Sequence, residues 1–232
     1  MTEKDIISKN LDIIRNNIEK ACIKANRKID DIDIIGVTKT IDIERIKILK
    51  ELGINTFGEN KAQEFLEKYD EIDNVSWHFI GNLQTNKVKY IIDKVKLIQS
   101  VNSFRLLEEI NKRALNSNIV MPILLEINIA NEQSKHGLIE QDLPYILENM
   151  QNFKNVILNG LMCVAPFVEN PRQNAQYFGK MRKLFIDIKH KNKDNINMKY
   201  LSMGMTNDYE VAIEEGANIV RIGTGIFGRR NY

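Results

Sequence analysis

Lys39 is the residue of this sequence best placed to act as a nucleophile. It follows the apolar run at residues 34–37 and stands between Thr38 and Thr40. Such a run is typical of a short strand buried on both faces. A lysine at the end of that strand has its stem held in protein and its amine at the rim, where it can lose its charge and react. The alternative is an ordinary solvated lysine, because the chain holds 33 lysines and arginines.

Two groups of small residues near the end of the chain suit a phosphate. Ser202 and Gly204 precede a predicted helix, and helix N-terminal amides attract anions. Gly223 and Thr224 offer a permissive backbone and a hydroxyl. Each residue also has a local explanation, since glycines permit tight turns and Ser202 can begin a helix. Together with Lys39, the two groups favour a phosphate site beside an amine.

Arg221 lies two residues before Gly223 in a predicted strand, so both point the same way, across the same rim. An always-charged guanidinium is costly there unless it has a partner. It can bind a phosphate, or it can donate to a pyridine nitrogen and so keep that nitrogen unprotonated. The alternative is a structural ion pair with Glu59 or Glu126.

The elements that position these residues alternate between short apolar strands and helices, and this predicts a parallel sheet covered by helices. Eight such units indicate a closed (β/α)₈ TIM barrel. Strands are predicted at residues 32–38, 54–58, 76–81, 97–101, 121–129, 158–164, 199–203 and 218–223. The helices between them are predicted at 41–52, 61–69, 84–93, 103–116, 140–150, 172–190 and 207–215, and a polar loop at 190–197.

An extra amphipathic helix at residues 2–26 precedes the first strand, with an apolar stripe that includes Ile7, Leu11, Ile14 and Ile18. The segment from Thr224 onward is too short to form a full eighth helix. In a closed barrel the first and last strands are neighbours. We therefore expect the N-terminal helix to cover the gap between them.

Composition excludes several classes of protein. The chain has 232 residues with 43% hydrophobic content, which suits one domain over residues 1–232. A net charge of +2 with interspersed signs predicts no nucleic-acid partner. The N-terminus resembles no signal peptide and no apolar run approaches ~18 residues, so we expect a cytoplasmic protein without a membrane partner. Cys22, Cys163 and three scattered histidines show no metal-ligand spacing, so no metal is expected.

A phosphate site within reach of a lysine at a barrel mouth allows two chemistries. One is a Schiff-base aldolase that acts on a phosphorylated sugar. The other is pyridoxal 5′-phosphate (PLP), held by its phosphate and by an imine to Lys39. The residues discussed so far are compatible with both.

Several short motifs extend this pattern over nearly the whole chain. They are residues 36–40 (GVTKT), 57–60 (FGEN), 77–81 (WHFIG) with 83–84 and 86–87, 134–137 (SKHG), 160–162 (GLM), 201–205 (LSMGM) and 221–228 (RIGTGIFG). In this order the motifs resemble the pyridoxal phosphate homeostasis protein family. That family comprises PLP-binding barrels related to the N-terminal barrel of bacterial alanine racemases.

The resemblance implies a barrel of PLP fold type III without a C-terminal β domain. It implies that Lys39 forms the internal aldimine with PLP. The other implied cofactor-binding residues are Asn60 and Met162 at the ring wall, Arg221 near the pyridine nitrogen or the phosphate, and Ser202, Gly204, Gly223 and Thr224 around the phosphate. His78 also matches a family position. The alternative explanation of this residue is a structural one, a strand histidine that bonds to a backbone carbonyl. Asn82 replaces a common proline, which leaves the mobility of residues 82–84 open.

An alanine racemase-like enzyme needs a second acid–base group on the far face of the cofactor, which is a tyrosine in that family. None of the seven tyrosines of this chain directly follows a predicted strand. We therefore predict a protein that holds PLP for intracellular vitamin B6 homeostasis, with indirect effects on amino-acid and keto-acid balance and no robust catalysis. Its expected partners are PLP and PLP-dependent apo-enzymes, and we expect a monomer. The alternative is a PLP-dependent racemase-like enzyme of low activity.

Overall fold

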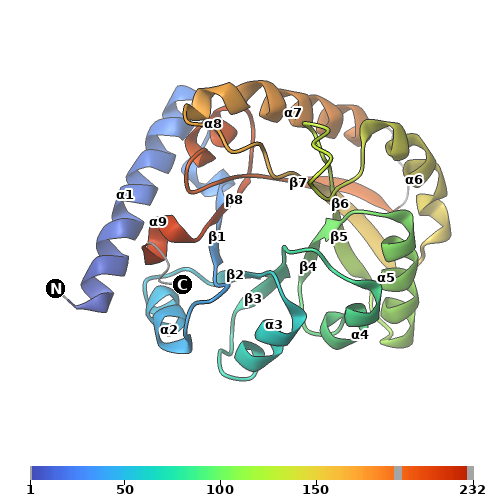
Figure 1. Cartoon of the computed structure of the whole chain (residues 1–232), viewed down its shortest axis with the longest axis horizontal. Helices are drawn as coiled ribbons and strands as arrows, with labels where there is room; N and C mark the ends of the chain where they lie inside the picture. Colours follow the sequence, from blue (N-terminus) through green and yellow to red (C-terminus); the bar gives the residue numbers. More distant parts are fainter. Residues whose placement is uncertain (1, 191–194, 229–232) are drawn as a thin grey trace.

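The strands form a closed barrel. The computed structural model describes residues 2–190 and 195–228, and in them eight parallel strands pair in chain order (Figure 1). The ring closes where β1 pairs with β8, with Ile35 opposite Arg221. The predicted (β/α)₈ barrel is therefore confirmed. The strands are β1 (Asp33–Val37), β2 (Thr56–Glu59), β3 (Ser76–Phe79), β4 (Leu97–Val101), β5 (Met121–Glu126), β6 (Val156–Met162), β7 (Ile196–Met205) and β8 (Ile219–Ile222).

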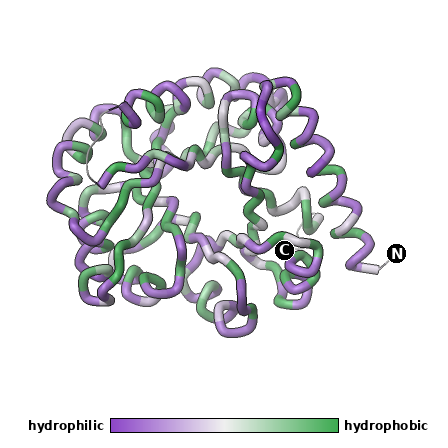
Figure 2. The backbone as a smooth tube through the Cα atoms, turned by 180° about the vertical axis from the view of Figure 1, so that it is seen from behind, coloured by the Kyte–Doolittle hydropathy of each residue, from purple (hydrophilic) through white to green (hydrophobic). Residues whose placement is uncertain are grey.

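The helices surround the ring, and hydrophilic and hydrophobic residues alternate along them (Figure 2). Among the described residues, no helix has both the length and the apolar character needed to cross a membrane. The helices are α1 (Glu3–Lys24), α2 (Ile43–Glu51), α3 (Ala62–Tyr69), α4 (Val88–Ile91), α5 (Phe104–Asn116), α6 (Leu143–Asn149), α7 (Ala175–Lys189), α8 (Tyr209–Glu214) and α9 (Thr224–Phe227).

The bounds of most predicted elements differ from the structure by one to three residues, as for the strand predicted at 121–129, which ends at Glu126. Two other elements differ in kind or extent. The helix predicted at 84–93 is a 3₁₀ turn at Thr85–Lys87 followed by the single turn of α4. The loop predicted at 190–197 ends earlier, because Ile196 already pairs with Leu158 of β6 and begins β7. Residues 191–194 of that loop lie outside the described residues.

The barrel interior has an apolar layer, and polar side chains lie further along two of its strands. These polar side chains are Arg221 and Gln99, each two residues further along its strand than an apolar-layer member. The polar groups therefore lie toward the carboxyl ends of the strands, where barrel enzymes and binding proteins have their sites. The apolar layer consists of Ile35, Leu97, Leu124, Met162 and Ile219.

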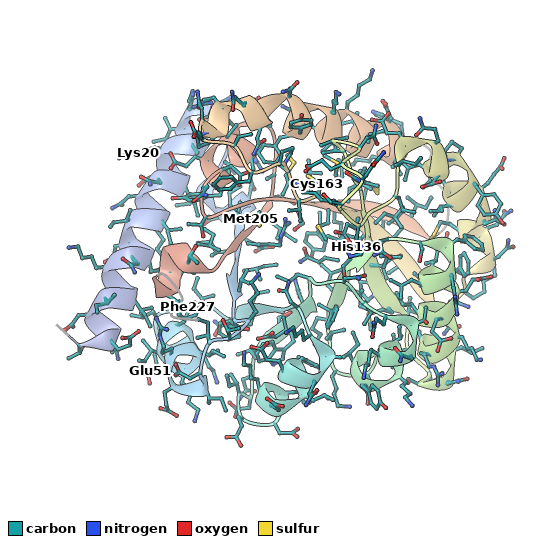
Figure 3. The ribbon with its side chains drawn as sticks, in the orientation of Figure 1. Lys20, Glu51, His136, Cys163, Met205 and Phe227 are labelled. Carbon is teal, nitrogen blue, oxygen red and sulfur yellow. The ribbon has the colours of Figure 1, made fainter. Side chains whose placement is uncertain are left out.

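Helix α1 closes the barrel between its first and last units. It packs against α8, α9 and α2, and the short α9 lies between α1 and β1 (Figures 1 and 3, where Phe227 marks α9). Asn10 donates to the carbonyl of Ile226 at 2.9 Å, and Arg27 donates to that of Ile213 at 2.9 Å. The expectation that the N-terminal helix covers this gap is confirmed.

We predict that the buried stripe of α1 contributes strongly to stability. Ile14 is 4% exposed, whereas the adjacent Ile13 is 50% exposed. Ile14→Ala should lower the free energy of unfolding by about 3 kcal/mol through lost burial and a residual cavity. Ile13→Ala is the matched control and should change it by less than about 0.5 kcal/mol. Urea denaturation measures both values, and similar losses for the two variants would contradict the role given to α1.

Candidate functional site

A cavity of about 360 Å³ opens at the carboxyl ends of β1, β6, β7 and β8. Its size suits a small-molecule ligand or cofactor. Four residues predicted from the sequence line it: Lys39, Arg221, Gly223 and Thr224. The remaining lining residues are Val37, Lys135, Val164, Ala165, Pro166, Phe167, Val168, Pro171, Asn174, Met205, Thr206, Asn207 and Asp208.

Lys39 occupies a tight turn that directly follows β1. The Thr38 amide still pairs with the Gly58 carbonyl of β2 at 3.1 Å, and the Ile41 amide donates back to the Thr38 carbonyl at 2.9 Å. Lys39 and Thr40 therefore form the corner of the turn. Lys39 is half-buried, and no residue in the described ranges bonds or pairs with its amine. The amine is consequently available to a ligand in the cavity.

Arg221 forms the floor of the cavity. Its side chain is almost fully buried, and it donates to the Ser202 hydroxyl at 2.6 Å and to the Cys163 carbonyl at 2.7 Å. Within the described part of the chain no carboxylate lies within 4 Å of it, so the ion pair considered with Glu59 or Glu126 is absent there. Burial lowers the pKa of Arg221. Two of its five N–H donors have protein partners, which leaves others for a ligand.

A chain of hydrogen bonds continues from Arg221 across the barrel. The Ser202 hydroxyl donates to Gln99 Oε1 at 2.6 Å, and Gln99 Nε2 lies 3.0 Å from His78 Nδ1. His78 Nε2 in turn lies 3.4 Å from the Ser76 hydroxyl. Gln99 Nε2 can only donate, so a neutral His78 accepts at Nδ1 and carries its proton at Nε2, where it can donate to Ser76. Every bond then runs in one direction, from Arg221 to Ser76.

His78 is therefore bonded to the Gln99 side chain, and the backbone-carbonyl alternative is wrong. Burial lowers the pKa of His78 to about 4, which keeps the imidazole neutral at the pH of the cell. The nearby Cys163 thiol is also inert, because burial raises its pKa to about 12.

The loops after β7 and β8 meet at Thr206. Its hydroxyl accepts from the Thr224 hydroxyl at 3.2 Å and from the Gly225 amide at 3.1 Å. No acceptor for the Thr206 hydroxyl hydrogen is present among the described residues, so a ligand oxygen can take it. Asp208 holds the loop by accepting from the Met205 amide at 2.7 Å.

Four other predicted residues lie near the cavity without lining it. Ser202 is beneath it, bonded to Arg221. Gly204 has φ +88°, and a Cβ there would lie 2.6 Å from the Ala212 Cβ, so glycine lets α8 approach the loop. Met162 belongs to the apolar layer. Asn60 follows β2, and its buried Oδ1 has no partner among the described residues.

Several lining residues were not among the predicted cofactor contacts. Lys135 belongs to the 134–137 motif, which the sequence did bring to this rim, and its amine donates to Glu132 at 2.6 Å. Thr206 directly follows the 201–205 motif and was not predicted as a contact. Phe167 lies at the cavity rim and is 85% exposed, which no sequence pattern indicated.

The loop at residues 82–84 is tied to its neighbours across the mouth. The Asn82 amide nitrogen lies 3.2 Å from His136 Nε2, and its Oδ1 accepts from Asn102 at 3.1 Å. These two bonds connect Asn82 to the loops that follow β4 and β5. His136, Cys163 and Met205 mark the region around the central opening in Figure 3.

Known proteins share this barrel and its length. The family model for the alanine racemase N-terminal domain matches residues 9–231. A pyridoxal phosphate homeostasis protein of Aquifex aeolicus is 43% identical over 221 residues, covering 94% of this chain and 96% of that protein. Another, from Haemophilus influenzae, is 34% identical and covers 97% of both chains. The structure of PipY from Synechococcus elongatus PCC7942 with PLP bound has a TM-score of 0.83 and 26% identity, and covers 96% of this chain and 100% of that one.

The fold and the matched residues define a barrel of the alanine racemase N-terminal domain class. Within that class, the chain belongs to the pyridoxal phosphate homeostasis protein family, as the two relatives aligned over almost their full length show. The family resemblance stated from the motifs is thereby confirmed, as is the type III barrel with its additional N-terminal helix. In the described residues every named strand belongs to the barrel, and no separate β domain is present there.

We predict a specific pH dependence from His78. Its pKa is about 4 in the folded chain and near 6.5 when unfolded. Below pH 6.5 the unfolded chain binds a proton that the folded chain refuses, so the free energy of unfolding falls as the pH drops toward 4. His78→Gln lacks this titration. The stability advantage of the wild type over this variant should shrink by up to about 3 kcal/mol between pH 7 and pH 4.

Urea denaturation of both proteins at several pH values measures this difference. Comparing the two proteins removes the contributions of all other titrating groups that they share. A stability difference that stays constant from pH 7 to pH 4 would contradict the burial of a neutral His78.

Proposed function

We propose that this protein binds PLP in the cavity beside Lys39 and acts in the homeostasis of that cofactor. The observation that carries the proposal is that one cavity is lined by the amine of Lys39, which has no partner among the described residues, by the buried guanidinium of Arg221, and by the loops after β7 and β8 with Thr206, Gly223 and Thr224. The PLP-bound structure of PipY and the names of the relatives support it. When bound, PLP supplies an aldehyde that condenses with a primary amine and a ring that can withdraw electrons.

The residues present fit each part of this cofactor. Lys39 supplies the amine for the aldehyde. Thr206 has a hydroxyl hydrogen free for a phosphate oxygen, and Gly223 with Thr224 supplies backbone and hydroxyl at the same loop. The unpartnered Oδ1 of Asn60 can accept from a ligand hydroxyl.

Three predicted residues do not line the cavity and would support the residues or the ligand in it: Ser202, Gly204 and Met162. Ser202 orients Arg221 by accepting one of its hydrogen bonds, and Gly204 allows α8 to support the phosphate loop. Met162 supports the cofactor ring from the apolar layer. Arg221 would donate either to the ring nitrogen of PLP or to its phosphate. At the ring nitrogen it would keep that nitrogen unprotonated, because a guanidinium does not readily give up its proton.

The cavity favours retention of the cofactor over racemisation. Among the described residues that line it there is no tyrosine, and the amine of Lys135 is bonded to Glu132. A reversible exchange of protons on both faces of a substrate needs a second acid–base group. We therefore infer that a monomer in the cytoplasm holds PLP and passes it to PLP-dependent apo-enzymes, with racemase-like activity at most weak.

We predict that borohydride reduction of the PLP-loaded protein fixes the cofactor on Lys39. Peptide mapping should find the pyridoxyl group there, and Lys39→Ala should lose it together with the visible absorbance of the imine. Lys47→Ala is the control, because Lys47 is an exposed lysine of α2 paired only with Glu44. A pyridoxyl group on Lys135, or an unchanged spectrum in Lys39→Ala, would refute the assignment.

We also predict that the loaded protein reactivates an apo-enzyme while free PLP is being trapped. Direct transfer should be faster than reactivation by the same amount of free PLP under the trap. Lys39→Ala mixed with PLP provides the baseline. If the trap abolishes reactivation by the wild type, the protein stores the cofactor and does not deliver it.

A further inference from the structure

Thr40, the neighbour of Lys39, has an unusual backbone conformation. Its φ is +61°, in the left-handed region that disfavours side chains branched at Cβ. The other described non-glycine residues with positive φ are all asparagines, the type that tolerates this region best: Asn26, Asn74, Asn118 and Asn131. Thr40 is therefore the exception, and something else must hold it there.

The turn itself demands this conformation. The bond from the Ile41 amide to the Thr38 carbonyl places Lys39 at the second position of a β-turn and Thr40 at the third. Negative φ at the second position and positive φ at the third are the signs of a type II turn, which usually has glycine or asparagine at the third. If Thr40 relaxed to negative φ, the peptide between Lys39 and Thr40 would flip, the turn would become type I, and the Thr40 amide would point in another direction.

One carboxylate holds Thr40 in place. Glu64, on α3, accepts the hydrogen bond of the Thr40 amide and also accepts from Lys68 at 2.7 Å. Burial would raise the pKa of Glu64, but these two donors outweigh it and lower the pKa, so the carboxylate stays charged. A charged acceptor makes a strong bond to a backbone amide.

The other side of Lys39 is held by the same cluster. Lys68 donates to the Thr38 carbonyl and to Glu59, both at 2.7 Å, in addition to Glu64. Glu59 also accepts from the Thr38 hydroxyl at 2.6 Å. The three ammonium hydrogens of Lys68 are thus all used, and both Lys68 and Glu59 are almost fully buried.

These side chains lie outside the cavity. None of Glu59, Glu64 and Lys68 is among its lining residues. A buried ion pair is weak evidence for stability, since desolvation opposes the attraction of the charges. The cluster is better explained by what it holds, which is the backbone on both sides of one lysine.

We propose that Glu64, Lys68 and Glu59 are positioning residues that fix the direction of the Lys39 amine through Thr38 and Thr40. This inference rests on the proposed function, because it assumes that the Lys39 amine is what PLP reacts with. The turn is held before any ligand arrives, so formation of the C=N bond, in which the amine displaces the aldehyde oxygen as water, needs no reordering of the loop.

The first test compares two glutamates of α3. Glu64→Ala removes the acceptor of the Thr40 amide, whereas Glu67→Ala removes an exposed glutamate of the same helix. We expect Glu64→Ala to weaken PLP binding about tenfold, or about 1.4 kcal/mol, and to slow the appearance of the imine absorbance. Glu67→Ala should match the wild type. Glu64→Gln keeps an acceptor oxygen and the volume, and should bind more tightly than Glu64→Ala.

The second test separates positioning from general destabilisation. Thr40→Asn in the Glu64→Ala background places at position 40 the residue that tolerates positive φ, and should restore most of the lost affinity. The inference is overturned if Glu64→Ala binds like Glu67→Ala, if Glu64→Gln binds more weakly than Glu64→Ala, or if the double variant stays as weak as Glu64→Ala. A wild type that never forms the adduct on Lys39 would instead overturn the proposed function.

Discussion

The interior of this barrel depends on a buried cation, Arg221, with which no carboxylate of the described residues pairs. Arg221 donates to a hydroxyl and to a backbone carbonyl, both neutral acceptors. Neutral acceptors compensate only part of the cost of burying a charge. Asp208 and Glu126 are close enough to favour its charged form, although neither pairs with it among the described residues. The phosphate and the ring nitrogen of PLP are acceptors that its remaining N–H donors can meet.

The directional chain behind Arg221 explains which hydroxyl can meet a phosphate. Ser202 uses its only hydroxyl hydrogen on Gln99, so its oxygen is an acceptor toward Arg221. Thr206 accepts two hydrogen bonds and keeps its hydrogen. A phosphate oxygen needs donors. The Ser202 hydroxyl is therefore structural. The Thr206 hydroxyl, four residues later, keeps a hydrogen that is available to a ligand.

The barrel and part of its cavity lining could be predicted from the sequence, because both follow from local patterns of residues. The barrel followed from apolar runs alternating with helical patterns, and Lys39, Arg221, Gly223 and Thr224 followed because the register of parallel strands brings their carboxyl ends together. The partner of Glu59 could not be predicted. Its side chain points away from the barrel interior to Lys68 of α3, and the side of the wall that a residue at a strand end faces depends on local twist and bulges. The direction of the hydrogen bonds around Ser202 depends on a glutamine 103 residues away in sequence.

The barrel has two groups of hydrogen-bonded polar side chains, one inside its wall and one outside. Inside, the chain from Arg221 to Ser76 sets the charge and donors that a cofactor meets. Outside, the Lys68 cluster sets the direction from which the Lys39 amine enters. Both groups are complete among the described residues before a ligand is present, so binding loses little conformational entropy.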